Sequence, residues 1–256
     1  MSVATRRDGG VLEVVLDRPK ANAIDAATSR ELGAIFSDFM SDGDLRVAIL
    51  TGAGDRFFSA GWDLGAAAEG EAFESDYGPG GFGGFPELPS RPKPIIAAVN
   101  GLAVGGGFEI AMAADFLVAA EHAEFFLPEV LRGVIADAGT VRLPRLVPPH
   151  LAREMLLTGR RMDAAEAARW GIVHEVVPRE RLMDAARALA ARLCAAAPLS
   201  VAAVLEVMRA TEALGTADAM TAMRRHAAYR ACIDSLDAQE GPRAFAEKRD
   251  PVWQGR

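Results

Sequence analysis

Cysteine and histidine are scarce in this chain of 256 residues, which holds two cysteines and four histidines. Cys194 and Cys232 lie in helical patterns, and their spacing fits neither a disulfide framework nor a metal site. The histidines show no ligand spacing with one another or with the cysteines. We therefore expect a reducing compartment and no metal.

A surplus of positive charge is also absent. Lys and Arg total 28 against 35 Asp and Glu, which gives a net charge of −7 and a pI of about 5.2. Nucleic acids and anionic membranes attract clustered basic side chains, so neither is an expected partner. The apolar runs are too short to span a bilayer, and the first ten residues, MSVATRRDGG, lack the apolar centre of a signal peptide. These features predict a soluble cytoplasmic protein.

Three common catalytic or nucleotide-binding motifs are missing. The dinucleotide fingerprint G-x-G-x-x-G fails because Ala103 stands two residues after Gly101. The phosphate loop fails because no Lys follows the glycines at 105–107. Ser59 has Phe57 two residues before it, so it cannot be the nucleophile of a G-x-S-x-G elbow. Carboxylates and backbone amides remain as candidates for chemistry.

Short apolar runs that alternate with helical patterns indicate an α/β fold. The expected strands are 11–16, 47–50, 57–61, 94–99, 116–119, 125–126 and 172–176. Helical patterns follow the capping residues Asp25 and Asp163, cover 152–158, and dominate 179–196 and 198–235. The segment 66–92 is rich in Gly, Pro and aromatic residues, and a loop of that length is usually functional or mobile. We expect a core over 1–197 and a C-terminal helical oligomerisation region over 198–256.

The stretch 94–109, PIIAAVNGLAVGGGFE, is the most informative part of the chain. Three glycines, 105–107, let the backbone approach a ligand closely, and the helix that follows presents its first N–H groups to an anion. Glu109 lies in that first turn, and Glu129 lies between Pro128 and an apolar pair, a setting that raises a carboxyl pKa. A tight turn with two ordinary surface glutamates explains the same residues, and spacing alone does not choose between these interpretations.

Four segments together resemble the crotonase, or enoyl-CoA hydratase/isomerase, superfamily. They are FFSAGWDL (57–64), PIIAAVNGLAVGGGFEIAMAADF (94–116), LPEVLRG (127–133) and LTGRRMDAAEAARWGIVHEVVP (157–178). The resemblance covers nearly the whole chain in order and ends with EGPRAFAEKRDP (240–251). It implies a spiral of strand-strand-helix repeats with C-terminal helices that build a homotrimer or a dimer of trimers.

The resemblance also assigns roles. It implies an oxyanion hole made of the backbone N–H groups of Ala60 and Gly106, which hold a thioester oxygen as it becomes an enolate. Glu109 and Glu129 match the two acids that add water to, or remove it from, an acyl-CoA. No tightly bound cofactor is implied, because the CoA thioester is the substrate. Residues implied to contact CoA or the acyl thioester are Gly61, Trp62, Asp63, Leu64 and Lys248.

The expected acyl group comes from finer similarity. The segments 17–25, 57–71, 78–82 and 244–256 resemble the branch of the family that interconverts L-carnitinyl-CoA and crotonobetainyl-CoA. Aromatic side chains for the trimethylammonium group would come from Trp62 and from the loop, at Phe73, Tyr77, Phe82 and Phe85, with favourable charge from Glu71, Glu74 and Asp76. Packing of the loop against the core explains the same aromatic residues.

One segment departs from the family pattern. In GVIADAGT (133–140), Ala136 and Thr140 stand where the family usually has a proline and a glycine. The sequence therefore leaves open whether this chain keeps the reaction and the acyl preference of the family. Two other functions remain: a general short-chain enoyl-CoA hydratase or isomerase, and a non-catalytic oligomeric scaffold or RNA-binding member, which the acidic composition and both glutamates disfavour.

Overall fold

The computed structural model describes residues 2–256. The chain forms two compact units, of which the first ends at Ala190 and the second contains Ser90–Pro94 and Ala191–Arg256. The expected boundary after residue 197 falls later than this one and assigns 90–94 to the core. Helix α7 (Leu182–Cys194) continues across the boundary without a break, so the sequence has no glycine or proline there that would mark the boundary.

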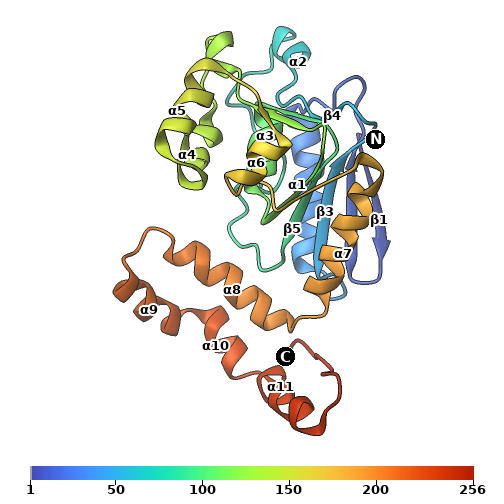
Figure 1. Cartoon of the computed structure of the whole chain (residues 1–256), viewed down its shortest axis with the longest axis vertical. Helices are drawn as coiled ribbons and strands as arrows, with labels where there is room; N and C mark the ends of the chain where they lie inside the picture. The colour runs from blue at the N-terminus through green and yellow to red at the C-terminus, as the bar shows by residue number, and fades with distance from the viewer. Residues whose placement is uncertain (1) are drawn as a thin grey trace. The chain divides into compact units, whose positions relative to one another are not determined.

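A six-stranded sheet forms the centre of the first unit, in the order β1-β2-β3-β5-β7-β10 (Figure 1). Its strands are β1 (Val3–Asp8), β2 (Val11–Leu16), β3 (Val47–Gly52), β5 (Ile95–Val99), β7 (Phe116–Ala120) and β10 (Glu175–Val177). Strand β1 pairs antiparallel with β2, and the later neighbours are parallel. Every residue of β3 and β5 is buried, as expected for parallel strands covered on both faces. The apolar runs predict five of these strands, while β1, buried only at Val3, was not expected.

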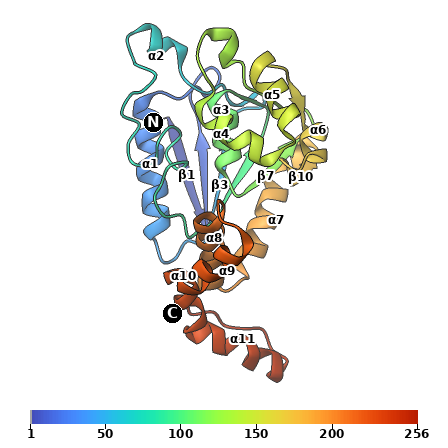
Figure 2. The same cartoon turned by 90° about the vertical axis from the view of Figure 1, so that its left-hand side faces the viewer.

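Helices cover the two faces of this sheet. Helix α1 (Ala26–Ser41) lies on one face and α7 on the other, as the two views show (Figures 1 and 2). The Asp25 side chain accepts the Thr28 N–H at 2.7 Å, so the predicted cap is confirmed. The other helical segments of this unit are α2 (Leu64–Ala68), α3 (Gly106–Ala113), η1 (Glu129–Arg132), α4 (Asp137–Leu146), α5 (Pro149–Thr158), α6 (Ala164–Arg169) and η2 (Arg179–Arg181).

A smaller sheet positions the candidate site. It contains β4 (Phe57–Ser59), β6 (Leu102–Val104), β8 (Glu124–Phe126) and β9 (Met162–Asp163), in that order. Strands β4, β6 and β8 are mutually parallel, so their carboxyl ends meet at one edge. Residues 60–64, 105–109 and 128–129 directly follow these three strands. Segments far apart in the chain therefore reach the same place.

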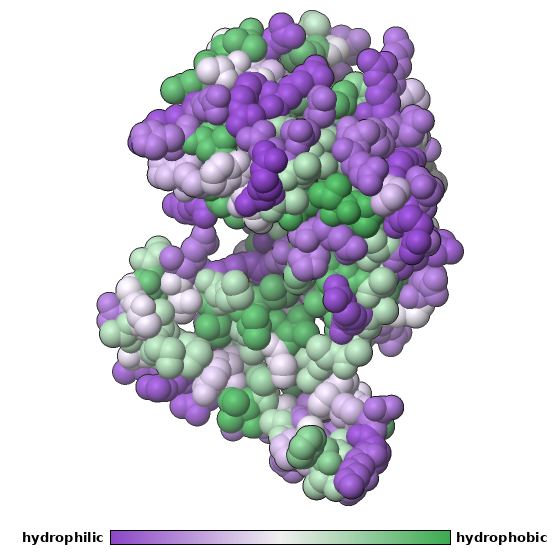
Figure 3. All heavy atoms as spheres, in the orientation of Figure 1, coloured by the Kyte–Doolittle hydropathy of each residue, from purple (hydrophilic) through white to green (hydrophobic). Residues whose placement is uncertain are grey.

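The second unit is helical. Its elements are α8 (Pro198–Thr211), α9 (Thr216–Arg225), α10 (Ala227–Ile233) and α11 (Leu236–Glu247), so the expected continuous helical tail is interrupted at Gly215, His226 and Ser235. Figure 3 shows green, hydrophobic surface over this unit. Its exposed large apolar side chains include Val204, Met208, Leu214, Met220, Ile233 and Phe245. Such side chains suit helix packing, and the expected oligomerisation role stays a prediction.

Within residues 2–256, no single helix is long and apolar enough to cross a membrane, and only the bent pair 179–194 and 198–211 passes by length and composition.

Candidate active site

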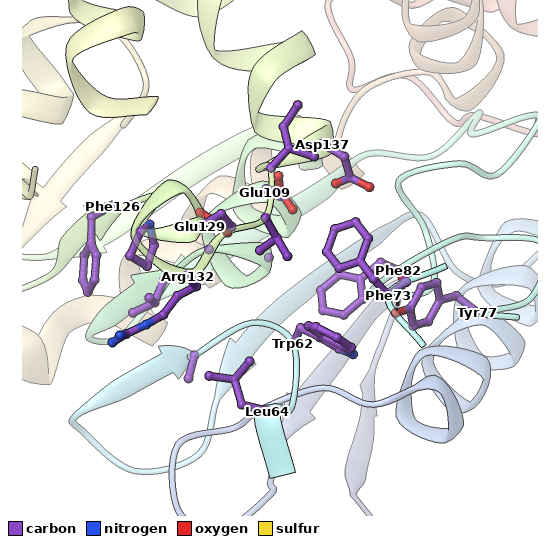
Figure 4. Close-up of a pocket in the computed structure, with 17 residues that line it drawn as sticks. Trp62, Leu64, Phe73, Tyr77, Phe82, Glu109, Phe126, Glu129, Arg132 and Asp137 are labelled. Atoms are coloured by element: carbon purple, nitrogen blue, oxygen red, sulfur yellow. Dashed lines mark hydrogen bonds between the residues drawn. The ribbon is translucent and has the colours of Figure 1, made fainter. Parts of the chain in front are cut away.

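A cavity of about 270 Å³ opens at the edge where β4, β6 and β8 end (Figure 4). Segments 60–64, 104–109, 126–137 and the loop 73–82 contribute its walls. The side chains that line it include two glutamates, one aspartate, one arginine, one leucine and a group of aromatic residues: Trp62, Leu64, Phe73, Tyr77, Phe82, Glu109, Phe126, Glu129, Arg132 and Asp137.

The start of α3 presents a backbone donor to this cavity. The N–H groups of Phe108 and Glu109 both donate to the carbonyl oxygen of Gly105, at 2.8 and 3.0 Å. In residues 2–256 the Gly106 N–H, which lines the cavity, has no acceptor. Gly61 packs directly against this donor: a Cβ there would lie 2.7 Å from the Gly106 nitrogen, and φ is +78°. The Gly106 N–H is thus available to a ligand, and its role in an oxyanion hole stays a prediction.

The prediction for Ala60 is wrong. Ala60 lines the cavity, but its N–H donates to the Ala21 carbonyl at 2.9 Å and is not available. Ile24 forms a parallel bridge with Trp62: its N–H donates to the Gly61 carbonyl at 2.8 Å, and its carbonyl accepts the Asp63 N–H at 2.9 Å. In such a bridge the central residue turns its own N–H away from the partner strand. The Trp62 N–H therefore points away from Ile24, and because Trp62 lines the cavity, this amide replaces that of Ala60 as the candidate for the second donor.

Glu109 is held inside the protein, with only 8% of its surface exposed. Its Oε1 accepts the Gly139 N–H at 2.7 Å. Burial raises the pKa of Glu109 to about 7, and the negative charges of Asp137 and Glu129 add to this rise, while the Gly139 hydrogen bond and Arg142 oppose it. A carboxyl group with this pKa exchanges a proton readily near neutral pH, as an acid–base catalyst must.

Glu129 approaches the same cavity from the end of β8, at the first residue of η1. Burial raises its pKa, with a further contribution from Asp137. Its Oε1 would lie 2.4 Å from a Cβ at position 105, so Gly105, with φ of +54°, leaves the space that the carboxylate occupies. Its Oε2 is buried and has no hydrogen-bond partner in the described chain. A buried carboxylate oxygen without a donor is in place to take a proton from a ligand.

Four aromatic rings form the other side of the cavity. Trp62 meets Phe73 edge-on with centroids 5.4 Å apart, and Tyr77 meets Phe82 in the same way at 5.4 Å. Trp62 Nε1 donates to Glu71 Oε1 at 3.0 Å, which fixes the indole ring. In Figure 4, Glu129 and Arg132 lie to one side of Glu109, and the rings lie to the other.

Phe85 does not belong to this wall, contrary to the prediction. It is fully buried in the core, with its ring 4.8 Å from that of Phe36 in α1. The acidic residues expected beside the rings are also placed differently. Glu71 is bound by Trp62 and by the Ala26 N–H at 3.0 Å, while Glu74 and Asp76 do not line the cavity.

The other residues predicted to contact CoA or the acyl thioester differ in whether they line the cavity. Leu64 lines the cavity and is 61% exposed. The Asp63 carboxylate caps α2, accepting the Gly65 N–H at 2.9 Å, and pairs with Arg18 at 3.1 Å, so it lies outside the cavity lining. Lys248 is exposed at the end of α11 in the second unit, and its contact with CoA stays a prediction.

The sequence interpretation missed two charged residues in the cavity, Arg132 and Asp137. Asp137 lies in the segment 133–140, where the sequence departs from the family pattern. A charged residue in that segment was the signal that could have identified it. Residues 2–256 contain no group of three or more His, Cys, Asp or Glu side chains arranged to hold a metal ion.

Comparison with known proteins places the chain in a family. A family model described as enoyl-CoA hydratase/isomerase matches residues 6–256. A carnitinyl-CoA dehydratase of Citrobacter koseri is 58% identical over 98% of this chain and 97% of its own length. A carnitinyl-CoA dehydratase of Escherichia coli K12 is 56% identical over 100% of this chain and 99% of its own length.

Solved structures agree. An enoyl-CoA hydratase from Mycobacterium tuberculosis matches with a TM-score of 0.92 and 38% identity, covering 100% of this chain and 99% of that one. One from Bacillus anthracis matches with a TM-score of 0.89 and 33% identity, with both chains fully covered. With its spiral core and its order of motifs, this chain belongs to the enoyl-CoA hydratase/isomerase, or crotonase, family.

Proposed function

We propose that this protein dehydrates L-carnitinyl-CoA to crotonobetainyl-CoA and catalyses the reverse hydration. The observation that carries this proposal is the meeting of two glutamates with raised pKa values, the buried Glu109 and the half-buried Glu129, in one cavity with the free Gly106 N–H. The choice of acyl group is supported by relatives of 56–58% identity that are named carnitinyl-CoA dehydratase.

The oxyanion is held by backbone. The thioester oxygen accepts hydrogen bonds from the N–H groups of Gly106 and Trp62, which stabilise it as the α-carbon loses its proton. Removing one such donor typically costs about 3–4 kcal/mol of transition-state stabilisation. Both donors come from rigid positions, the first turn of α3 and the bridge to Ile24, so they are oriented before the substrate binds.

The two glutamates divide the proton transfers. In dehydration, Glu129 takes the α-proton, and its buried Oε2 has no competing donor in the described chain. Glu109, with a pKa of about 7, gives its proton to the departing β-hydroxyl, which leaves as water while the carbon–carbon double bond forms. Hydration reverses both transfers. Each positioned acid or base contributes on the order of a hundredfold or more.

The test is turnover of L-carnitinyl-CoA and 3-hydroxybutyryl-CoA by the wild type and by two isosteric variants. Glu109→Gln and Glu129→Gln are each expected to fold normally and to lose at least about 99% of kcat. Near-wild-type turnover in either variant would refute the assignment of that glutamate. Binding of nucleic acid without turnover of any acyl-CoA would instead favour the scaffold or RNA-binding function.

The general short-chain hydratase is the second candidate, favoured by the 38% identical enoyl-CoA hydratase structure. The aromatic rings separate the two candidates. A trimethylammonium group against aromatic faces gains about 2 kcal/mol when desolvated, whereas a neutral methyl group gains no such electrostatic term. Trp62→Ala should therefore raise KM for L-carnitinyl-CoA more than for 3-hydroxybutyryl-CoA, and equal increases would argue for the general hydratase.

We further propose a cytoplasmic homotrimer or dimer of trimers. The exposed apolar side chains of α8 to α10 support assembly, and two free cysteines support a reducing compartment. In such an assembly we assign Lys248 to the nucleotide part of CoA. Sedimentation should give the mass of three or six chains, and a monomer at micromolar concentration would contradict this proposal.

A further inference from the structure

The proton transfers use two of the three carboxylates that line the cavity and leave Asp137 without a role. Asp137 begins α4 and faces the cavity beside Glu109 (Figure 4). It also lines an adjoining hollow of about 190 Å³, again together with Phe82 and Glu109. The side chain therefore borders both spaces, on the side of Glu109 where the aromatic rings lie.

The charge of Asp137 is not neutralised by the protein. Among residues 2–256 no lysine or arginine forms an ion pair with it, and its Oδ1 accepts a hydrogen bond from the Ala138 N–H at 2.6 Å. Its negative charge reaches the neighbouring groups. Burial is the main cause of the raised pKa of Glu109 and of Tyr77, and Asp137 adds to the rise in both.

The proposed substrate places its positive charge close to the reacting carbons. In L-carnitinyl-CoA the quaternary nitrogen is two bonds from the β-carbon that bears the hydroxyl. When Glu109 donates to that hydroxyl, the nitrogen must lie beside Glu109. Phe82 and Asp137 are the aromatic and the acidic residue that border Glu109 in both spaces. A ring face and a carboxylate without a salt-bridge partner are the groups that attract a cation that cannot donate hydrogen bonds.

We propose that the carboxylate of Asp137, with the ring of Phe82, holds the trimethylammonium group and makes this enzyme selective for cationic acyl-CoA substrates. This inference rests on the proposed function. It assigns to Asp137 a role in substrate choice and not in proton transfer. It also explains why an exposed third acid stands beside Glu109 and Glu129, where its negative charge raises the pKa of both.

The experiment compares kcat/KM for L-carnitinyl-CoA with that for the neutral 3-hydroxybutyryl-CoA. The readout is the ratio of the two, because loss of the Asp137 charge also shifts the pH profile for both substrates through Glu109. In Asp137→Asn the ratio should fall at least about tenfold, chiefly through KM of the cationic substrate. Asp137→Glu, which keeps the charge, should restore part of it.

Glu74→Gln is the matched control, since it removes one negative charge from an exposed position outside the cavity lining. Its ratio should stay within about twofold of wild type, as for a screened surface charge. Higher salt should lower the wild-type ratio, and this measurement remains decisive if Asp137→Asn does not fold.

The outcomes separate this inference from the proposed function. A wild type that prefers L-carnitinyl-CoA, with the same preference in Asp137→Asn, would overturn the role of Asp137 and leave the proposed reaction standing. A preference that does not change with salt would overturn it as well. A wild type that turns over only the neutral substrate would refute the proposed acyl group and this inference together.

Discussion

Replacing Glu109 by glutamine should stabilise the protein while it removes activity, and the gain should depend on pH. In the folded protein the pKa of Glu109 is about 7, against an ordinary value of 4.5, chiefly because the side chain is buried. Between pH 4.5 and pH 7, therefore, Glu109 is protonated in the folded state and ionised in the unfolded chain. Its stability falls as pH rises through this window and levels off above about pH 7.

The magnitude follows from the two pKa values. Each pKa unit corresponds to about 1.4 kcal/mol, so the difference amounts to about 3 kcal/mol of lost unfolding free energy above pH 7. Glutamine has nearly the same shape, cannot ionise, and still accepts the Gly139 N–H through its carbonyl oxygen. Glu109→Gln should therefore be about 3 kcal/mol more stable than wild type at pH 8, and this difference should shrink to about 1 kcal/mol or less at pH 5.

The assay is urea unfolding of both proteins at pH 5 and pH 8, at one protein concentration. Glu74→Gln serves as the control for removal of an exposed charge, and it should show no comparable pH dependence. The same stability difference at both pH values, or a variant that is less stable at pH 8, would show that Glu109 does not carry an unfavourable buried charge.

Three further substitutions test other parts of the site. Gly61→Ala would place a Cβ 2.7 Å from the Gly106 nitrogen at a φ of +78°, so kcat should fall at least about a hundredfold and the melting temperature should drop; an active, stable variant would contradict the close approach. Phe85→Ala should lower the unfolding free energy by about 3–5 kcal/mol, because the ring is fully buried, and leave the substrate preference unchanged. Glu71→Gln can accept only one of the two hydrogen bonds that the carboxylate accepts, so it should lose about 1 kcal/mol of stability and loosen Trp62, with less discrimination between cationic and neutral substrates.

Sequence patterns predicted the strands and helices whose characteristic residues lie within the element or directly beside it. Apolar runs mark the buried strands β3 and β5, and Asp25 lies directly before the helix that it caps. Strand β1 escaped because its side chains are exposed after Val3 and its pairing depends on β2. Helix α4 was not expected, because its first residues lie in the segment 133–140, where the chain departs from the family pattern.

Two of the errors in the site have non-local causes. Ala60 and Trp62 are two residues apart, and which N–H faces the cavity is decided by Ala21 and Ile24, on a different segment. Phe85 lies in a glycine-rich loop, and the composition of such a loop predicts a position at the surface. That loop approaches α1 so closely that a Cβ at Gly84 would lie 2.4 Å from a backbone nitrogen of the helix, and this contact carries the ring into the core.

The bridge between Ile24 and Trp62 has a consequence for how this enzyme can be dissected and how it can evolve. A main-chain N–H is present whatever the side chain, so an alanine substitution at Trp62 would measure the loss of the indole ring and leave the backbone N–H in place. Only an ester in place of that peptide bond deletes the donor by itself. The same independence frees position 62 to change for new acyl groups while the proposed oxyanion contact of its backbone is kept.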